Sequence, residues 1–242
     1  MSTFEITGGV DPLLTVQMQK GDVLFAESNA MVAMDKSLTL TGVAHGGVLS
    51  SLGRKLLNDE NFFQERFEAK EGPGTVLLAP TIPGDVKLLD VGTRTYMLSD
   101  GAYLASTEGV TLEIKSQGLG KALFARSGGF FLMKATGCGT LAVSGFGSIR
   151  ALTITPDKPL VVDNGHVVAW DASLNYDLTI NTAHRGFFGK LIEGAVTGEG
   201  IVLTFTGTGT VLVCSRNRGG FIDWIAGNLP QDLFRPGKEG IA

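Results

Sequence analysis

Three basic residues that each follow a glycine suggest an anion-binding site. They belong to a string whose glycines are 67 and 69 residues apart (53 to 120 and 120 to 189), with the copies Gly53-Arg54-Lys55-Leu56, Gly120-Lys121-Ala122-Leu123 and Gly189-Lys190-Leu191-Ile192. If an internal rotation relates the copies, Arg54, Lys121 and Lys190 gather at one axis, where a phosphate or carboxylate would relieve their repulsion. Helical turns starting at these glycines would add exposed N–H groups. We predict that the three cations bind a small anionic ligand; far from the axis they would be ordinary solvated side chains.

The histidines and cysteines give weaker indications of chemistry. His166 and Asp171 are five residues apart, and an odd separation places two side chains on opposite faces of a continuous strand. Cys138 lies between two glycines, and its counterparts in two related Gly-x-Gly turns are Pro73 and Thr208, which favours a turn residue over a nucleophile. The sequence contains no Gly-x-Ser-x-Gly elbow, Walker loop or dinucleotide fingerprint. We expect no catalytic residue, no metal site and no cofactor.

The composition argues against several classes of protein. The chain has 242 residues, a net charge of -4, and 34 glycines without a collagen period. Its acidic balance argues against a nucleic-acid partner, and the lack of an uninterrupted apolar run of about 18 residues argues against a membrane span. Charged residues make up 18% of the chain, compared with roughly 25% in a typical domain. The surface should therefore retain apolar patches that favour self-association.

The cysteine content and the first residues suggest a compartment. Cys138 and Cys214 are too few for a disulfide framework, and two buried free thiols in a reducing compartment are favoured over a bridge between them. The segment from Met1 to Ile6 has neither a basic region nor an apolar stretch. We therefore expect no secretory signal and a cytoplasmic location.

Two further strings recur in the same order and define repeats. One joins two strand-like runs through a residue–glycine pair, and its copies contain Lys20-Gly21, Asp100-Gly101 and Asn164-Gly165. The other is Gly-x-Gly-Thr ahead of an apolar run, and its copies start at Gly72, Gly137 and Gly207. The common register predicts three copies of one β-unit, at about residues 12–90, 91–155 and 156–222. We expect residues 1–242 to form a single compact unit with a C-terminal tail at 223–242.

The periodicity and the turn residues predict the elements of each copy. Leu14, Val16 and Met18 alternate with polar residues, which is typical of a half-buried strand. Asp-Gly and Asn-Gly favour type I′ turns, so we expect a hairpin at each residue–glycine pair. The first glycine of each Gly-x-Gly-Thr string should close a turn between paired strands, and the three should superpose about a pseudo-threefold axis. A short helix is predicted to start at Phe221–Ala226.

Three stretches resemble the altered-inheritance-of-mitochondria biogenesis family: Leu160 to Asp171, Thr197 to Gly209, and Gly72 to Asp85. The most specific is Asn164-Gly-His-Val-Val-Ala-Trp-Asp171, and the resemblance extends from about Phe4 to Trp224. It implies an all-β fold of three repeats like the tryptophan RNA-binding attenuation protein (TRAP), a β-sandwich related to double-stranded β-helices. The resemblance implies no established catalytic residues.

Residues and resemblance together predict a non-catalytic oligomeric binding or scaffold protein, not an enzyme. Repeated β-units leave strand edges that must be covered, so we expect a closed symmetric homo-oligomer, with a trimer favoured over a dimer. A second hypothesis is a sensor that binds an anionic metabolite or an amino acid between repeats or subunits. A third is an enzyme whose site forms only in the oligomer, and no convergent acid–base residues support it.

Overall fold

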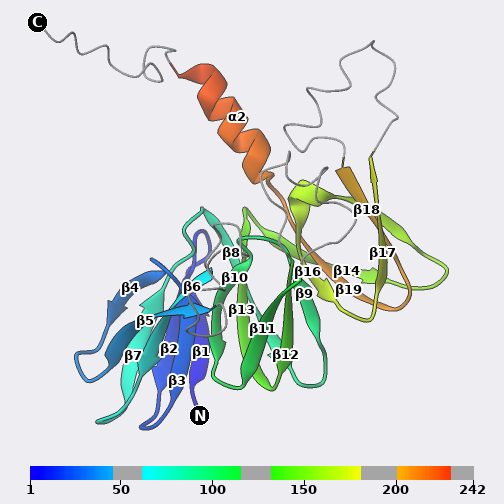
Figure 1. The fold of residues 1–242 in the computed structure, drawn as a ribbon. Helices are drawn as coiled ribbons and strands as arrows, with labels where there is room; N and C mark the ends of the chain where they lie inside the picture. Colours follow the sequence, from blue (N-terminus) through cyan, green and yellow to red (C-terminus); the bar gives the residue numbers. More distant parts are fainter. Residues whose placement is uncertain (46–61, 116–131, 181–200, 230–242) are drawn as a thin grey trace, which may run out of the picture.

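The computed structural model describes residues 1–45, 62–115, 132–180 and 201–229, whose strands form four sheets (Figure 1). The first strand, β1 (Thr3–Thr7), is followed by three successive sets of six strands. Set 1 consists of β2 (Leu13–Met18), β3 (Val23–Glu27), β4 (Met31–Met34), β5 (Thr39–His45), β6 (Phe62–Glu68) and β7 (Gly74–Leu78). Set 2 consists of β8 (Gly84–Val91), β9 (Tyr96–Leu98), β10 (Tyr103–Thr107), β11 (Val110–Lys115), β12 (Leu132–Gly137) and β13 (Gly139–Phe146). Set 3 consists of β14 (Ile149–Ile154), β15 (Leu160–Asp163), β16 (Val167–Asp171), β17 (Asn175–Ile180), β18 (Ile201–Thr206) and β19 (Gly209–Cys214).

The pairing of the strands repeats from set to set. In every set the sixth strand lies between the first and the third, and the fifth lies between the second and the fourth, all antiparallel. The second strand of one set also pairs with the third strand of the next. These contacts are junction 1, formed by β3 and β10, and junction 2, formed by β9 and β16. Figure 1 shows the sets side by side, with β4 at one end of the row and β17 and β18 at the other.

The buried apolar side chains form three clusters, and each cluster combines residues of two neighbouring sets. Leu14, Val16 and Met18 are buried on one side of β2, as their alternation predicts, and they belong to the first cluster, which also contains Leu104 of set 2. A second cluster includes Tyr103 of set 2, and a third includes Trp170 of set 3. The prediction of an all-β chain is therefore confirmed for the described residues.

The Gly-x-Gly-Thr strings make the same contact in all three sets. The threonine of each string donates its backbone N–H to the side chain of the residue that ends or follows the third strand. The pairs are Thr75 with Asp35 (2.8 Å), Thr140 with Thr107 (3.1 Å) and Thr210 with Asp171 (2.7 Å). The second glycine of each string faces the same turn, where a Cβ would meet Leu38 at Gly74, Thr107 at Gly139 and Asp171 at Gly209. This shared contact is the physical reason why the strings recur.

The hairpins predicted at the residue–glycine pairs are wrong. The strands on either side of each pair lie in different sheets, so these turns carry the chain between layers. The local geometry does agree with the turn signal, because Gly21 and Gly101 have φ values of +89° and +70°. The dipeptide favours a positive φ, but it does not specify which strands pair.

The turns of the Gly-x-Gly-Thr strings also differ from the prediction. Gly72, Gly137 and Gly207 lie outside helices, but the strands that flank each of them belong to different sheets and are not paired. The consecutive strands that do pair within a set are β5 with β6, β11 with β12, and β17 with β18. The loops that join these three pairs lie outside the described residues.

A helix follows the last strand, close to the predicted position. Helix α2 spans Arg218–Asn228, so it includes the first residues of the expected tail. It contacts the strands through Arg218, which lies 3.3 Å from Asp100, and through Phe221, whose ring centroid is 5.1 Å from that of Phe146. Within the described ranges, no helix has the length and apolar character needed to cross a membrane.

Candidate functional site

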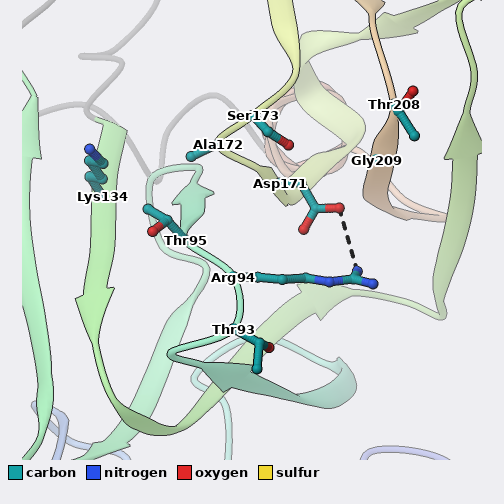
Figure 2. Close-up of a pocket in the computed structure, with 9 residues that line it drawn as sticks. All are labelled: Thr93, Arg94, Thr95, Lys134, Asp171, Ala172, Ser173, Thr208 and Gly209. Carbon is teal, nitrogen blue, oxygen red and sulfur yellow. Dashed lines mark hydrogen bonds and ion pairs between the residues drawn. The ribbon is translucent and has the colours of Figure 1, made fainter.

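A pocket of about 540 Å³ opens beside junction 2, where sets 2 and 3 meet. Its walls come from the loop between β8 and β9, from β12, from the end of β16 and the turn after it, and from the turn between β18 and β19. The described lining residues are Thr93, Arg94, Thr95, Lys134, Asp171, Ala172, Ser173, Thr208 and Gly209 (Figure 2). The lining therefore combines hydroxyl groups with one carboxylate and two cations.

Asp171 is the most buried charged group of this pocket. It ends β16 and is 5% exposed. Its Oδ2 accepts the Thr210 N–H at 2.7 Å and lies 3.5 Å from Nη1 of Arg94. Its Oδ1 is buried and accepts no hydrogen bond from the described part of the chain. An unsatisfied buried acceptor of this kind costs about 1–3 kcal/mol, and a ligand donor would recover this cost if a rotation of the Asp171 side chain brought Oδ1 to the pocket surface.

Arg94 lies across from this carboxylate. Figure 2 shows its side chain extended toward Asp171, with the guanidinium group facing the carboxylate oxygens. The distance of 3.5 Å is long for a charge-assisted hydrogen bond, and the Arg94 side chain is 57% exposed. Part of its guanidinium group therefore remains open to an anionic group of a ligand while the contact with Asp171 is kept.

Two neighbours complete the electrostatics of the pocket. Lys134 stands on β12 and adds a second positive charge to the lining (Figure 2). Tyr96 pairs with Asp171 across junction 2. Burial raises the pKa of the Tyr96 phenol and the Asp171 carboxylate raises it further, so this side chain stays neutral and the charges of the site are those of Asp171, Arg94 and Lys134.

The arrangement suits a small ligand that carries both signs of charge. A ligand ammonium or N–H group matches Asp171, and a ligand carboxylate or phosphate matches Arg94 and Lys134. The hydroxyls of Thr93, Thr95, Ser173 and Thr208 can bond to either part. No histidine or cysteine belongs to the described lining.

The predicted site residues Arg54, Lys121 and Lys190 lie outside the described residues, and the anion site that they would form remains a prediction. Arg94 and Lys134 were not predicted from the sequence. Arg94 and Asp171 are 77 positions apart, and no local motif connects them. The sequence feature that could have indicated Asp171 is the Gly-x-Gly-Thr string of set 3, whose threonine donates its backbone N–H to this carboxylate.

The other residues considered for chemistry have structural surroundings. His166 ends the 3-10 turn η2 (Asn164–His166), with Nδ1 2.8 Å from the carbonyl oxygen of Cys214. Cys138 and Cys214 are both free. Cys214 is buried, and burial raises the pKa of its thiol. Cys138 is exposed, so the expectation of two buried thiols is wrong for this residue, whose turn lies on the surface.

Comparisons with known proteins agree with the sequence resemblance. A protein of Streptococcus pyogenes serotype M6, described as uncharacterized, is 32% identical over 228 residues, which cover 92% of this chain and 87% of that protein. The crystal structure of another Streptococcus pyogenes protein is similar with a TM-score of 0.76 and 29% identity, over 95% of this chain and 100% of that one. The family model described as mitochondrial biogenesis AIM24 matches residues 4–216. The chain therefore belongs to the AIM24 family.

Proposed function

We propose that this protein is a non-catalytic, self-associating binding protein that holds a small zwitterionic ligand, such as an amino acid, at junction 2. The observation that carries the proposal is the buried Asp171 carboxylate, with an unpartnered Oδ1, in a pocket that also contains Arg94 and Lys134. The role predicted from the sequence was an oligomeric scaffold or binding protein, with a sensor as the second hypothesis. The pocket favours a binding protein with a ligand between repeats.

The charges favour a zwitterion over a simple anion. An anion would gain from Arg94 and Lys134, but the Asp171 carboxylate would repel it at short range. A purely cationic ligand would meet the reverse problem. An α-amino acid places an ammonium and a carboxylate a few ångströms apart, which matches an acid and two bases within one pocket of about 540 Å³.

The strand sets support the repeat and assembly parts of the proposal. We interpret set 1, set 2 and set 3 as three TRAP-like units related by a common rotation, since their pairing and their threonine contacts recur. These units cover residues 13–78, 84–146 and 149–214. The first two units therefore end before residues 90 and 155, where the strings placed the boundaries. The two free cysteines support a reducing, cytoplasmic setting.

A thermal-shift screen tests the ligand class. The wild type is heated with amino acids, with anionic metabolites that lack an amine, and with amines that lack an acid group. We expect stabilisation only by compounds that carry both charges, because binding to the folded state raises the midpoint of unfolding. Arg94→Gln and Lys134→Gln should each reduce the shift, whereas Arg150→Gln, an exposed arginine of β14 outside the pocket, should leave it unchanged. Stabilisation by simple anions alone would favour the anionic-metabolite sensor.

A further inference from the structure

We propose that β4 of one copy pairs with β15 of a second copy, so that the chains associate head to tail and continue the row of strand sets. The partner is therefore another copy of this chain. The inference rests on the proposed self-association and adds the surfaces that make it. It follows from the two junctions already present within one chain, which show which edge strands of this fold fit together.

The row of sets ends with one unused strand of each kind. Junctions 1 and 2 each join the second strand of one set to the third strand of the next. Within the described residues, set 1 is the first set in the row, and its third strand, β4, pairs with no second strand. Set 3 is the last described set, and its second strand, β15, pairs with no third strand. Among the described strands, β4 and β15 each end their sheet.

Burial shows what the missing contact would cover. Tyr103 and Leu104 at the start of β10 are 1% and 0% exposed, whereas Met31 and Val32 at the equivalent positions of β4 are 37% and 54% exposed. The equivalence follows from a β-bulge that all three third strands share against their sixth strand. The β4 edge is thus apolar in the same way as its counterparts, but open to solvent.

The same contrast holds on the other edge. All three residues of β9 are buried at junction 2, and its Met97 is 9% exposed. Val161 at the equivalent position of β15 is 61% exposed. An exposed apolar edge strand is a site for pairing with another chain. The β4 edge lacks a second strand as its neighbour, and the β15 edge lacks a third strand.

The internal junctions also specify the register. Leu24 lies opposite Thr107 at junction 1, and Tyr96 lies opposite Asp171 at junction 2. The corresponding residues of the free edges are Leu160 and Asp35. Pairing in the same register places Met34 opposite Val161 and Ala33 opposite Val162 across the two copies.

The charges at the free edges are complementary in the same register. At junction 2, Arg94 is two residues before Tyr96 and lies 3.5 Å from Asp171. In the new contact Lys158, two residues before Leu160, takes the place of Arg94, and Asp35 takes the place of Asp171. Lys158 and Asp35 are both exposed, so an opposite-charge pair would form between copies. A head-to-tail contact of this kind gives a ring when its rotation closes.

A charged residue on the edge provides the first test. Val161→Lys puts a lysine on the outer edge of β15, where it opposes strand pairing, and the high exposure of Val161 leaves the fold of one copy intact. Ile114→Lys is the matched control, because Ile114 is 47% exposed on β11, another edge strand. Light scattering at micromolar concentration should give a multiple of the chain mass for the wild type and the control, and the mass of one chain for Val161→Lys.

The outcomes separate this inference from the proposed function. A wild type of one chain mass at micromolar concentration overturns both the inference and the self-association, while the zwitterion screen still stands. An oligomer that persists in Val161→Lys overturns the inference alone, because copies would then associate through another surface.

Cross-linking tests the register directly. In a Cys138→Ser background, one protein carries Met34→Cys and a second carries Val161→Cys. We expect a disulfide-linked dimer when the two proteins are mixed and oxidised, and at least tenfold less in either protein alone. The pair Lys36→Cys and Val161→Cys, two positions out of register, is the control. Cross-links between identical proteins, or equal yields in the control pair, would contradict the proposed pairing.

Discussion

Junctions 1 and 2 share a backbone arrangement and differ in their chemistry. At both, a third strand with a bulge pairs with a second strand, and the residue that ends the third strand accepts the N–H of a Gly-x-Gly-Thr threonine. Junction 1 has the neutral Thr107 at that place. Junction 2 has the buried Asp171, with Arg94 against it. The repeated backbone arrangement thus determines where this side chain lies. The residue type at that position, Thr107 or Asp171, determines what the junction can bind.

The largest effect should come from the glycine that faces this residue at junction 1. Gly139 has a φ of +146°, and a Cβ there would overlap Oγ1 of Thr107. Gly209 at junction 2 lacks a positive φ, and its Cβ would lie 3.0 Å from Oδ2 of Asp171. Gly139→Ala should lower the unfolding free energy by about 3 kcal/mol, and Gly209→Ala by about 1 kcal/mol. Urea denaturation measures both, and equal losses would contradict the difference drawn between the two turns.

The next effect concerns the carboxylates that bind a threonine N–H. Asp171 is 5% exposed and faces Arg94, whereas Asp35 makes the same bond to Thr75 on an exposed turn. Asp171→Ala leaves the half-buried Thr210 N–H without an acceptor and removes the partner of Arg94, so it should cost about 2–3 kcal/mol of unfolding free energy. Asp35→Ala should cost less than about 1 kcal/mol, because water replaces the lost acceptor. If both variants lose the same amount in denaturant titrations, the burial of Asp171 is not what distinguishes junction 2.

A smaller, pH-dependent effect is expected beside junction 1. Burial and, to a smaller extent, the Asp100 carboxylate raise the pKa of Glu27 from 4.5 to about 7, against the opposing effect of Arg218. Set 2 has Ser99 at the equivalent position. Between these two pKa values the folded protein binds more protons than the unfolded chain. The unfolding free energy therefore falls as pH rises from about 4.5 to about 7, and this contribution is level above that range.

The variant Glu27→Gln removes this titration. At about pH 8 it should be more stable than the wild type by on the order of 2 kcal/mol, and near pH 4 the two should be equal. Unfolding free energies across this range measure the difference, with Glu5→Gln on the exposed side of β1 as the control. A pH profile of Glu27→Gln parallel to that of the wild type would show that Glu27 is not held neutral.

The local part of this fold could be predicted from the sequence, and the pairing could not. Leu14, Val16 and Met18 are buried because a strand alternates its side chains, and the Gly-x-Gly-Thr strings were visible because each makes the same contact. Asp100-Gly101 specifies a turn with positive φ, but such a turn fits a hairpin and a crossing between layers equally well. The partner of each strand depends on residues tens of positions away.

The candidate site was largely invisible in the sequence for the same reason. Asp171 was noticed only as a neighbour of His166, and the residue that faces it, Arg94, is 77 positions away. Neither Arg94 nor Lys134 belongs to a recurring string, because the site is a departure from the repeat. The recurring strings identify residues that maintain the fold. The proposed binding groups, Asp171, Arg94 and Lys134, lie at positions whose residue types differ between the sets.

Calorimetric titration of Asp171→Asn and Asp35→Asn tests the central claim that junction 2 binds a zwitterion. Each asparagine keeps an oxygen for its threonine N–H, so the two variants share the structural change and differ only in which carboxylate is lost. With the best amino acid from the thermal-shift screen, Asp171→Asn should weaken binding at least tenfold, about 1.4 kcal/mol. Asp35→Asn should bind as the wild type does. Equal affinity in all three proteins would contradict the account.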